Sequence, residues 1–535
     1  MSVAPRRAAL SHAWLRPGFA DLLVVFLVIL VASIGGGRLF GDADAATHVA
    51  TGSWILDHRQ IPRVDPFSGT HAGAEWFAHE WLADLGSALL YRASGWNGLV
   101  AAVALLVALP HVVLFRFLVR RGDEVLAAFG AVVAAAATAS SHWLARPHLL
   151  TVVCLALWTV TLESVVARRS GSRLLLWLPP LALLWANLHG GFLVAFGVLL
   201  CYGLGEVVAL QAAPSPERAG APGNRSLVRP LVAAGVVAAA CTLLNPWGWR
   251  LPAHLISFFT IHGPALKATT EFAPAAADDR AGLALFVFTG LCIAGVVCGL
   301  HAALFPSRAA VRGSVRPGRG PTGPFHPGTL LALALTTAMA FASIRHVELM
   351  TLFGALVISG GVSSLLRARS DGPTRDQLAA LRLREERSGG AYAVAAIVIV
   401  WILAILGLLP RAGFDPGQFP VGPVAALKRD GTVPAGPVFT PDVWGGYLIL
   451  EWPQARVFVD GRWDMYGDEF FKRYADIYMA RPGWSDALVS MGVTLAILPR
   501  DAPLVEAMEG HPDWVRQHAD ETSTVFRRRG LSEGS

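Results

Sequence analysis

Eleven apolar segments dominate this sequence, and most of them are long enough to cross a lipid bilayer as a helix. A transmembrane helix needs roughly 17–25 mainly apolar residues. Only 15% of the 535 residues are charged, whereas an ordinary soluble domain carries about 25%. These features exclude a soluble enzyme, a disordered chain and a nucleic-acid-binding module. The segments lie at 21–40, 97–119, 124–144, 148–167, 173–189, 191–211, 228–245, 282–304, 328–344, 346–364 and 391–409.

The predicted fold class is therefore a polytopic α-helical membrane protein with about 11 transmembrane helices. The first segment is too long for the apolar part of a signal peptide, so we expect it to remain as the first helix. The segments at 328–344 and 346–364 leave two interpretations open, because they fit either two short spans or one long bent helix.

Arginine residues predict the orientation of the chain. They gather in alternate loops, which all lie on the side of the N-terminus if the chain crosses eleven times, and basic loops stay in the cytoplasm. We expect the N-terminus inside and the C-terminal region outside the cytoplasmic (inner) membrane of a bacterium, with the basic loops against anionic membrane lipids. The arginines concerned are Arg120, Arg121, Arg168, Arg169, Arg173, Arg218, Arg225, Arg229, Arg308, Arg312, Arg316, Arg319, Arg367, Arg369, Arg375, Arg382, Arg384 and Arg387.

The composition changes near residue 410 to that of a soluble domain. Short β-like runs at 437–440, 456–460, 493–498 and 522–527 alternate with helix-like runs at 443–451, 468–479, 484–491 and 503–509. This alternation predicts a small α/β module with some parallel strand pairing. We therefore expect a transmembrane domain over 1–409, with a first outer loop at 41–96, and an extracytoplasmic α/β domain over 410–535.

The first outer loop gathers carboxylates and imidazoles. Asp42 and Asp44 directly follow the first apolar segment, and His48 shares a face with Asp44 if this part is helical. His79 and Glu80 open an amphipathic segment that we expect along the membrane interface. An aspartate here can act as a general base, and Asp42 with Asp44 can hold Mg²⁺ or Mn²⁺ together with phosphate oxygens. The alternative is that these acids are solvated or cap a helix.

Polar residues also mark four turns that are predicted on the outer side. They include Arg146, His189, Asn245 and Arg345. Ionisable residues near membrane depth are costly and usually face a cavity, although a single one is more often an interface anchor. Arginine binds phosphate through paired hydrogen bonds, so Arg146 and Arg345 are candidates to neutralise a phosphate or pyrophosphate.

A further candidate pair lies in the C-terminal region. Asp460 and Arg462 follow the β-like run at 456–460, and α/β sheets bind ligands at the carboxyl ends of their strands. A plain turn with a helix cap at Asp464 is the alternative interpretation.

The layout resembles the GT-C superfamily of membrane glycosyltransferases, which includes protein O-mannosyltransferases, aminoarabinose transferases and oligosaccharyltransferases. The resemblance rests on an Asp-x-Asp after the first helix, a long outer first loop ending in HEWL, and the later motifs NLHGG, NPWG, WGGY and VFVDGR. These motifs are similar to a bacterial branch of the superfamily and cover most of the chain.

The resemblance implies an enzyme that transfers a sugar from a polyprenyl-phosphate-linked donor to a lipid, glycan or protein acceptor at the outer membrane face. Asp44, or Asp42, would deprotonate the acceptor, and the phosphate would leave with help from arginine or a divalent cation. The later acidic motifs of oligosaccharyltransferases are missing near Arg146, so metal dependence stays open. The expected substrate-binding residues are His48, His79, Glu80, Arg146, His189, Arg345, Asp460 and Arg462.

Two other classes of function remain as alternatives. One is a transporter or flippase for a lipid or small solute, but such proteins place polar groups at mid-membrane on inverted repeats, whereas this sequence gathers them on one side. The other is a non-catalytic envelope assembly protein whose outer domain binds a partner.

Overall fold

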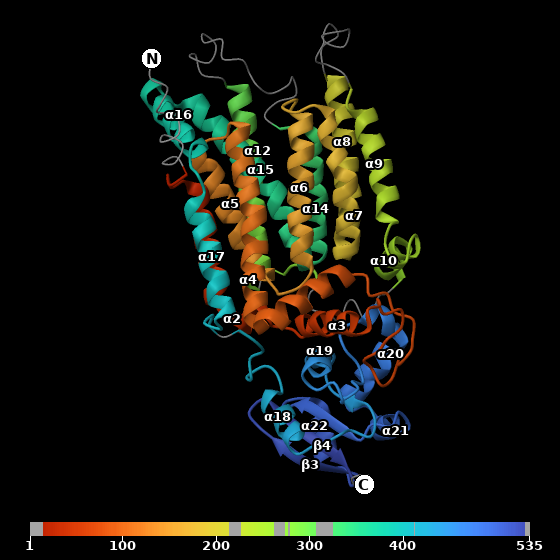
Figure 1. Cartoon of the computed structure of the whole chain (residues 1–535). Coiled ribbons are helices and arrows are strands. Elements are labelled where there is room, and N and C mark those ends of the chain that lie inside the picture. Colours follow the sequence, from red (N-terminus) through yellow and green to blue (C-terminus); the bar gives the residue numbers. More distant parts are fainter. Residues whose placement is uncertain are drawn as a thin grey trace.

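The computed structural model describes residues 14–212, 226–261, 273–276, 279–305, 325–410 and 412–529. Each of the eleven predicted apolar segments contains a helix, and these helices form an elongated bundle (Figure 1). A helix satisfies its own backbone hydrogen bonds, which is what a chain in hydrocarbon requires. The helices are α2 (Phe19–Leu39), α4 (Trp81–Arg121), α5 (Val125–Ala139), α6 (His148–Val166), α7 (Leu178–Leu188), α8 (Leu193–Ala212), α9 (Val228–Thr242), α12 (Arg280–Leu304), α14 (Pro327–Ala342), α15 (Val347–Arg369) and α17 (Ala391–Ile405).

The lengths and hydropathy of these helices define a multi-pass membrane protein. Among the described residues, six helices are long and apolar enough to cross a membrane, and a seventh candidate forms if α16 (Gly372–Glu386) and α17, bent by 46°, count as one span. Three shorter apolar helices lie at Phe19–Ile34, Val228–Thr242 and Pro327–Ala342. The full number of eleven crossings stays a prediction.

The segment from 328 to 364 forms two helices. α14 ends at Ala342, the short helix η6 (Ile344–His346) follows, and α15 begins at Val347 and packs against α14. Ser343 has an extended backbone, which ends α14. The two-helix interpretation is therefore confirmed, and a single long bent helix is excluded.

The two ends of the bundle differ in what they carry. The described N-terminal residues and α16 lie at one end, whereas α3 (Asp44–His58) and the C-terminal region lie at the other (Figure 1). This separation agrees with the predicted loop assignment, and the cytoplasmic or external identity of each end remains a prediction. Arg218, Arg225, Arg308, Arg312, Arg316 and Arg319 lie outside the described residues.

α4 joins the outer layer to the bundle. Its backbone leaves helical geometry at Ser94 and Gly95, where Gly95 has φ 59°, so the part before the bend runs beside α3 and the part after it enters the bundle (Figure 1). The two helices pack closely because α3 carries a glycine at their contact. A Cβ atom on Gly52 would stand 1.9 Å from the carbonyl oxygen of Asp84.

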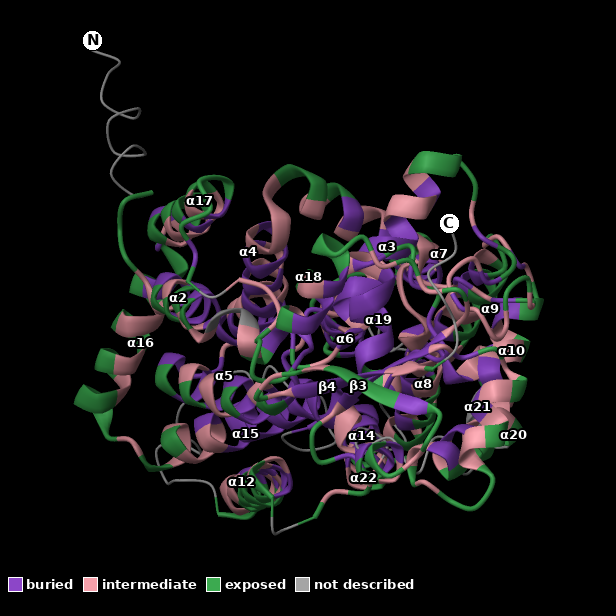
Figure 2. Ribbon diagram, turned by 90° about the horizontal axis from the view of Figure 1, so that it is seen from below, coloured by how far each residue is buried: buried purple, intermediate pink, exposed green. Residues whose placement is uncertain are grey.

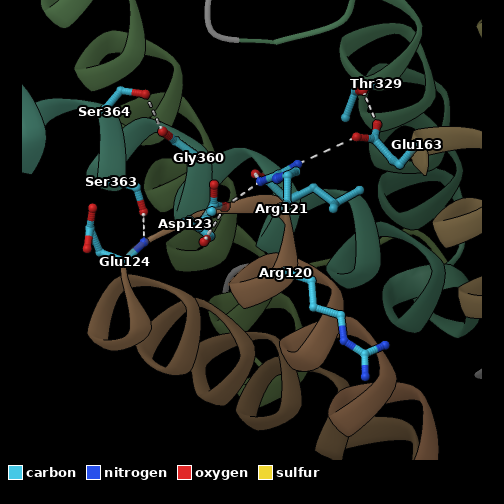
Figure 3. A network of polar contacts seen from close by, with 12 residues as sticks. Arg120, Arg121, Asp123, Glu124, Glu163, Thr329, Gly360, Ser363 and Ser364 are labelled. Carbon is cyan, nitrogen blue, oxygen red and sulfur yellow. Dashed lines mark hydrogen bonds and ion pairs between the residues drawn. The ribbon is translucent and has the colours of Figure 1, made fainter. Parts of the chain in front are cut away.

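A network of buried charges ties the helices together at the end away from α3. Figure 3 shows Arg121 between Asp123, at 2.5 Å, and Glu163, at 3.5 Å. Glu163 also accepts hydrogen bonds from Tyr202, at 2.6 Å, and from Thr329. The network thereby links α4, α6, α8 and α14. Pairing of this kind offsets the cost of burying a charge.

The C-terminal region contains a four-stranded sheet in the order β1-β2-β4-β3, with helices around it. β1 and β2 are parallel and the other neighbours are antiparallel, so the expected parallel pairing is only one part of the sheet. The elements are α18 (Val421–Arg429), β1 (Val438–Phe439), α19 (Asp442–Glu451), α20 (Trp463–Tyr478), α21 (Trp484–Ser490), β2 (Leu495–Pro499), α22 (Pro503–Glu509), β3 (Trp514–Ala519) and β4 (Ser523–Arg528).

The strand predicted at 456–460 is wrong. This segment makes only isolated bridges, in which Val457 pairs with Val438 on one side and with Ser68 of the first outer loop on the other. It therefore connects the loop to the sheet edge instead of forming a strand. The sequence patterns also missed α18 and β3, and most side chains of β3 are exposed.

The C-terminal region shares a hydrophobic core with the first outer loop. Ala43 and Ala50 are buried in the same cluster as Trp444 and Tyr447. Seen from the end that carries the C-terminal region, the buried residues of α19 lie near the centre of the molecule (Figure 2). The outer region therefore rests on α3, and the domain boundaries at 409 and 410 stay predictions.

Candidate active site

A cavity of about 1040 Å³ lies where the bundle, the first outer loop and the C-terminal region meet. Four chain segments from the bundle contribute to its wall: the start of α3, the α5–α6 turn, the α7–α8 turn and the α14–α15 turn. All of the predicted site residues except Asp460 line it. The predicted residues therefore converge on one space. They are Asp42, Asp44, His48, His79, Glu80, Arg146, His189, Arg345 and Arg462.

The Asp-x-Asp pair is held by an arginine. Arg146 binds both oxygens of Asp42, through Nη2 at 2.8 Å and Nε at 3.0 Å, and its Nη1 lies 3.3 Å from Asp44. Asp42 also accepts the backbone N–H of Asp44. The side chain of Asp44 is 38% exposed against 20% for Asp42, so Asp44 is the more accessible of the two carboxylates.

A second polar group lies on the first-loop side of the cavity and centres on Glu80. His48 Nδ1 lies 2.7 Å from Asp84, and its Nε2 lies 3.6 Å from Glu80. Burial lowers the pKa of His48, but the hydrogen bond to Asp84 and the charges of Asp84, Glu80 and Asp44 outweigh burial and raise that pKa to about 9. His48 is therefore protonated near neutral pH and faces a carboxylate on each side.

His189 approaches Glu80 from the opposite side, with its Nε2 at 3.3 Å from Oε1. Its Nδ1 accepts hydrogen bonds from the backbone of Gly191 and from the hydroxyl of Thr151, which in turn accepts a bond from Trp185. The proton of a neutral His189 must then sit on Nε2 and point at Glu80.

The charges around Glu80 agree with this arrangement. Burial lowers the pKa of His189 to about 4, and the positive charge of Arg345 acts in the same direction against the attraction of Glu80. Burial raises the pKa of Glu80, but its neighbours His189, His79 and His48 lower it overall. The site thus holds an ionised glutamate between a charged and a neutral histidine.

Arg462 and Asp460 have a different place from the predicted one. Arg462 is 8% exposed, binds Asp460 through two nitrogens at 2.7 and 2.6 Å, and lies 2.9 Å from Asp65. Its guanidinium also stacks over Trp76 at 4.5 Å. Asp460 is fully buried and does not reach the cavity wall. The pair therefore joins the outer region to the first loop, with only the edge of Arg462 on the cavity.

Eight ionisable residues of the cavity wall were not among the predicted site residues. Asp84 follows Glu80 by one helical turn, a spacing that was visible in the sequence. Glu348 belongs to the polar turn at Arg345, but nothing in the sequence showed that it faces the cavity. These residues are Asp84, His142, His148, His254, His346, Glu348, Asp442 and Asp464.

Two groups of side chains in the described part of the chain have the geometry to hold a metal ion. In each group, one ligand atom per residue lies within 4.8 Å of the others. The groups are His48, Glu80 and Asp84, and His142, His148 and Glu348. The predicted metal pair of Asp42 and Asp44 is in neither group of three, and both carboxylates contact Arg146.

Comparison with solved structures identifies the fold. The oligosaccharyltransferase of Archaeoglobus fulgidus in its apo form matches with a TM-score of 0.54 and 12% identity, over 92% of this chain and 70% of that chain. The archaeal oligosaccharyltransferase AglB from Archaeoglobus fulgidus, in complex with an inhibitory peptide and a dolichol-phosphate, matches with a TM-score of 0.52 and 13% identity, over 90% and 69%. The chain therefore has the GT-C fold of membrane glycosyltransferases, as its motifs predicted.

ArnT from Cupriavidus metallidurans, bound to undecaprenyl phosphate, aligns over 96% of this chain and 99% of that chain, with 15% identity and a TM-score of 0.47. No family model matches the sequence, and no curated protein matches it.

Proposed function

We propose that this protein is a glycosyltransferase that moves a sugar from a polyprenyl-phosphate-linked donor to an acceptor at the outer face of the bacterial cytoplasmic membrane. One observation carries the proposal: in a GT-C fold, acids and arginines from segments far apart in sequence converge on one large cavity at the end of the helix bundle. The dolichol-phosphate in the AglB complex supports a polyprenyl phosphate as the lipid partner. The acceptor is a lipid, a glycan or a protein.

Asp44 is the proposed general base. It is the more exposed of the two first-loop aspartates, and Arg146 fixes its position through the shared contact with Asp42. Asp44 accepts the proton of an acceptor hydroxyl or amine while the acceptor atom bonds to the anomeric carbon. The bond from that carbon to the phosphate oxygen breaks, the electron pair leaves with the phosphate, and the configuration inverts.

Arg345 is the proposed phosphate-binding residue. It lines the cavity beside the α14–α15 turn, where it has the charge to stabilise the leaving phosphate. Arginine is suited to this role because its planar group forms paired hydrogen bonds with phosphate oxygens. Arg146 contacts both Asp42 and Asp44, so we assign it to holding these two acids in position.

Glu80 is the proposed acceptor-binding residue. It is held ionised between His48 and His189 and is 18% exposed on the cavity side. A buried carboxylate in this position can accept a hydrogen bond from a substrate hydroxyl or amide. Holding the acceptor in line with the base lowers the activation free energy of the transfer step, by roughly 7–11 kcal/mol in the best cases.

A divalent cation is a further proposed component of this cavity. The predicted pair of Asp42 and Asp44 contacts Arg146, and two groups of histidines and acids also have suitable spacing. Such an ion would neutralise charge on the phosphate as it leaves. The proposed roles of Asp44, Arg345 and Glu80 are the same with or without a bound cation.

The test uses purified protein in liposomes with a panel of undecaprenyl-phosphate-linked sugars, and it measures release of free undecaprenyl phosphate. This readout needs no knowledge of the acceptor if a mixed lipid and peptide acceptor extract is supplied. We expect release by the wild-type protein and by Asp57→Asn, an exposed acid of α3 that pairs with Arg92 outside the cavity. Loss of release in Asp44→Asn supports the proposal. Full release by Asp44→Asn together with Asp42→Asn contradicts it.

A further inference from the structure

A second cavity lies at the end of the bundle away from α3, where the start of α2 meets α16 (Figure 1). It has a volume of about 410 Å³, and no step of the proposed transfer uses it. Phe19 and Leu22 of α2 line it together with Leu381, Arg384 and Glu385 of α16 and the chain that leads into α2. Apart from its two charged residues, the wall is apolar.

The acid of this cavity already has partners. The buried carboxylate of Glu385 accepts the backbone N–H of Phe19 at 2.7 Å and that of Ala20 at 3.1 Å. Asp21 accepts the backbone N–H of Gly18 at 3.0 Å. The first N–H groups of a helix need such acceptors, and here two carboxylates supply them. The start of α2 therefore does not attract an anion, and a ligand of this cavity must be recognised by other groups.

Arg384 is the cation of the cavity. Its side chain is exposed, and it makes no ion pair or hydrogen bond within the part of the chain that the structure describes. Two other arginines at this end of the bundle differ, because Arg367 donates to the carbonyl oxygen of Gly122 at 2.8 Å and Arg369 contacts His301 at 3.0 Å. The guanidinium of Arg384 is therefore available to an anionic group at the cavity.

An exposed apolar row continues from the cavity along α2. Leu22, Phe26 and Ile29 are all exposed, and their spacing of three or four residues places them on one face of the helix. In a membrane-spanning bundle, such a face lies against lipid acyl chains. The apolar span of α2 begins at Phe19, and the exposed Trp14 precedes it. Because tryptophan gathers at the membrane interface, the cavity lies at the depth of lipid headgroups.

We propose that this cavity binds one anionic phospholipid, with the lipid phosphate on Arg384 and an acyl chain along Leu22, Phe26 and Ile29. Arginine forms paired hydrogen bonds with phosphate oxygens, and basic pockets between membrane helices bind anionic headgroups. A lipid is the occupant that matches the whole surface, because a free phosphate compound would leave the apolar wall and the apolar row uncovered. The site is independent of the proposed transfer reaction.

This proposal differs from the general attraction between basic loops and an anionic membrane. That attraction depends on the summed charge near the membrane surface, so it predicts similar effects for any exposed arginine at this end of the bundle. A built site predicts instead that Arg384 matters and that Arg369, which is also exposed at this end, does not. The comparison of these two arginines is therefore the centre of the test.

The experiment titrates the delipidated full-length protein in detergent with phosphatidylglycerol or with phosphatidylcholine of the same acyl chains, and native mass spectrometry counts the bound lipids. We expect the wild-type protein to bind one phosphatidylglycerol more tightly than phosphatidylcholine. Arg384→Gln should bind phosphatidylglycerol at least about 5-fold more weakly, whereas the matched control Arg369→Gln should bind it like the wild-type protein. Leu22→Trp should also weaken binding, because it fills the cavity without changing a charge.

Three results would overturn the proposal. The first is equal affinity of the wild-type protein for the two lipids, and the second is equal binding by Arg384→Gln and Arg369→Gln. The third is binding of glycerol 3-phosphate as tight as that of phosphatidylglycerol, which would identify the occupant as a free phosphate compound. Unchanged binding in Leu22→Trp would likewise exclude this cavity as the place of the lipid. The melting temperature of each variant without added lipid separates loss of the site from loss of the fold.

Discussion

The two ends of the helix bundle both bury charged groups, but they use them differently. At the end away from α3, Arg121 is surrounded by Asp123 and Glu163, whose remaining bonds go to hydroxyls of Ser359, Tyr202 and Thr329. At the cavity end, Asp44, Glu80 and Arg345 line the cavity. The first arrangement is enclosed by protein and serves packing, whereas the second places charged groups along a space that a ligand can enter. Figure 3 shows how compact the closed network is.

This comparison separates stability from function. Charges of the closed network are expected to affect unfolding and leave substrate binding alone, and charges at the cavity are expected to do the reverse. The following predictions test that division, beginning with the largest effect.

Asp44→Asn removes the proposed base and leaves the shape of the side chain. We expect release of undecaprenyl phosphate from the sugar donor to fall by about 10²–10⁴-fold, the usual contribution of a general base. The melting temperature should change little, because Asp44 is partly exposed. The rate of undecaprenyl phosphate release and the thermal unfolding curve check both parts. An equal loss of release in the control Asp57→Asn would contradict a specific role for Asp44.

Arg121→Leu tests the closed network. It leaves Asp123 and Glu163, which are 0% and 6% exposed, without their cation, and breaking a buried pair costs about 3–5 kcal/mol. We expect a clear loss of stability in detergent, with unchanged affinity for undecaprenyl phosphate in the folded fraction. Arg120→Leu is the matched control, since Arg120 is the exposed neighbour that points away from the network (Figure 3). Equal destabilisation by both variants would show that the pairing does not matter.

Arg345→Gln tests the phosphate-binding side of the cavity. Loss of one charge-assisted hydrogen bond costs roughly 1.5–3 kcal/mol, so undecaprenyl phosphate should bind about 10-fold more weakly or worse in a native mass-spectrometry titration. Arg250→Gln serves as control, because Arg250 of α10 (Arg250–Ile261) pairs with Glu75 away from the cavity wall. Affinity unchanged by Arg345→Gln would place the phosphate elsewhere.

The pH dependence of stability gives the smallest expected effect. The pKa of His48 is raised to about 9 in the folded protein from an ordinary value of 6.5. The folded state thus holds this proton more tightly, so the stabilisation is fully present below pH 6.5 and is lost as the pH rises through 9. The melting temperature of the wild-type protein should fall more between pH 6.5 and pH 9 than the melting temperature of His48→Gln does. Parallel curves for the two proteins would contradict the assignment.

Much of the fold was predictable from local patterns. Apolar segments of membrane length correspond to helices throughout the bundle, and the Asp-x-Asp, HEWL and NLHGG motifs all reach one cavity. Prediction was weaker in the outer region. The run around Val457 looks like a strand, yet it only bridges Val438 and Ser68, because its position between the first loop and the sheet edge is set by tertiary contacts.

The candidate site was predictable in membership but not in roles. Asp42 and Asp44 are the predicted metal pair, and the structure shows that both carboxylates contact Arg146. Arg462 looked like a ligand-binding residue, and the structure ties it to Asp460 and Asp65. Arg146 and Asp65 lie far away in the chain from the residues that they contact, so no local spacing can reveal these two partners.

What the sequence determined by itself is the membrane class, the helical segments and the gathering of acids and histidines on one side, because hydrophobic length and charge placement act locally. Only the tertiary structure decided which charged side chains pair with one another and which of them line the cavity. It held His189 with its proton toward Glu80 through Thr151 and Gly191, and it brought Glu348 beside His148. Such choices depend on hydrogen-bond partners that meet only when the helices have packed.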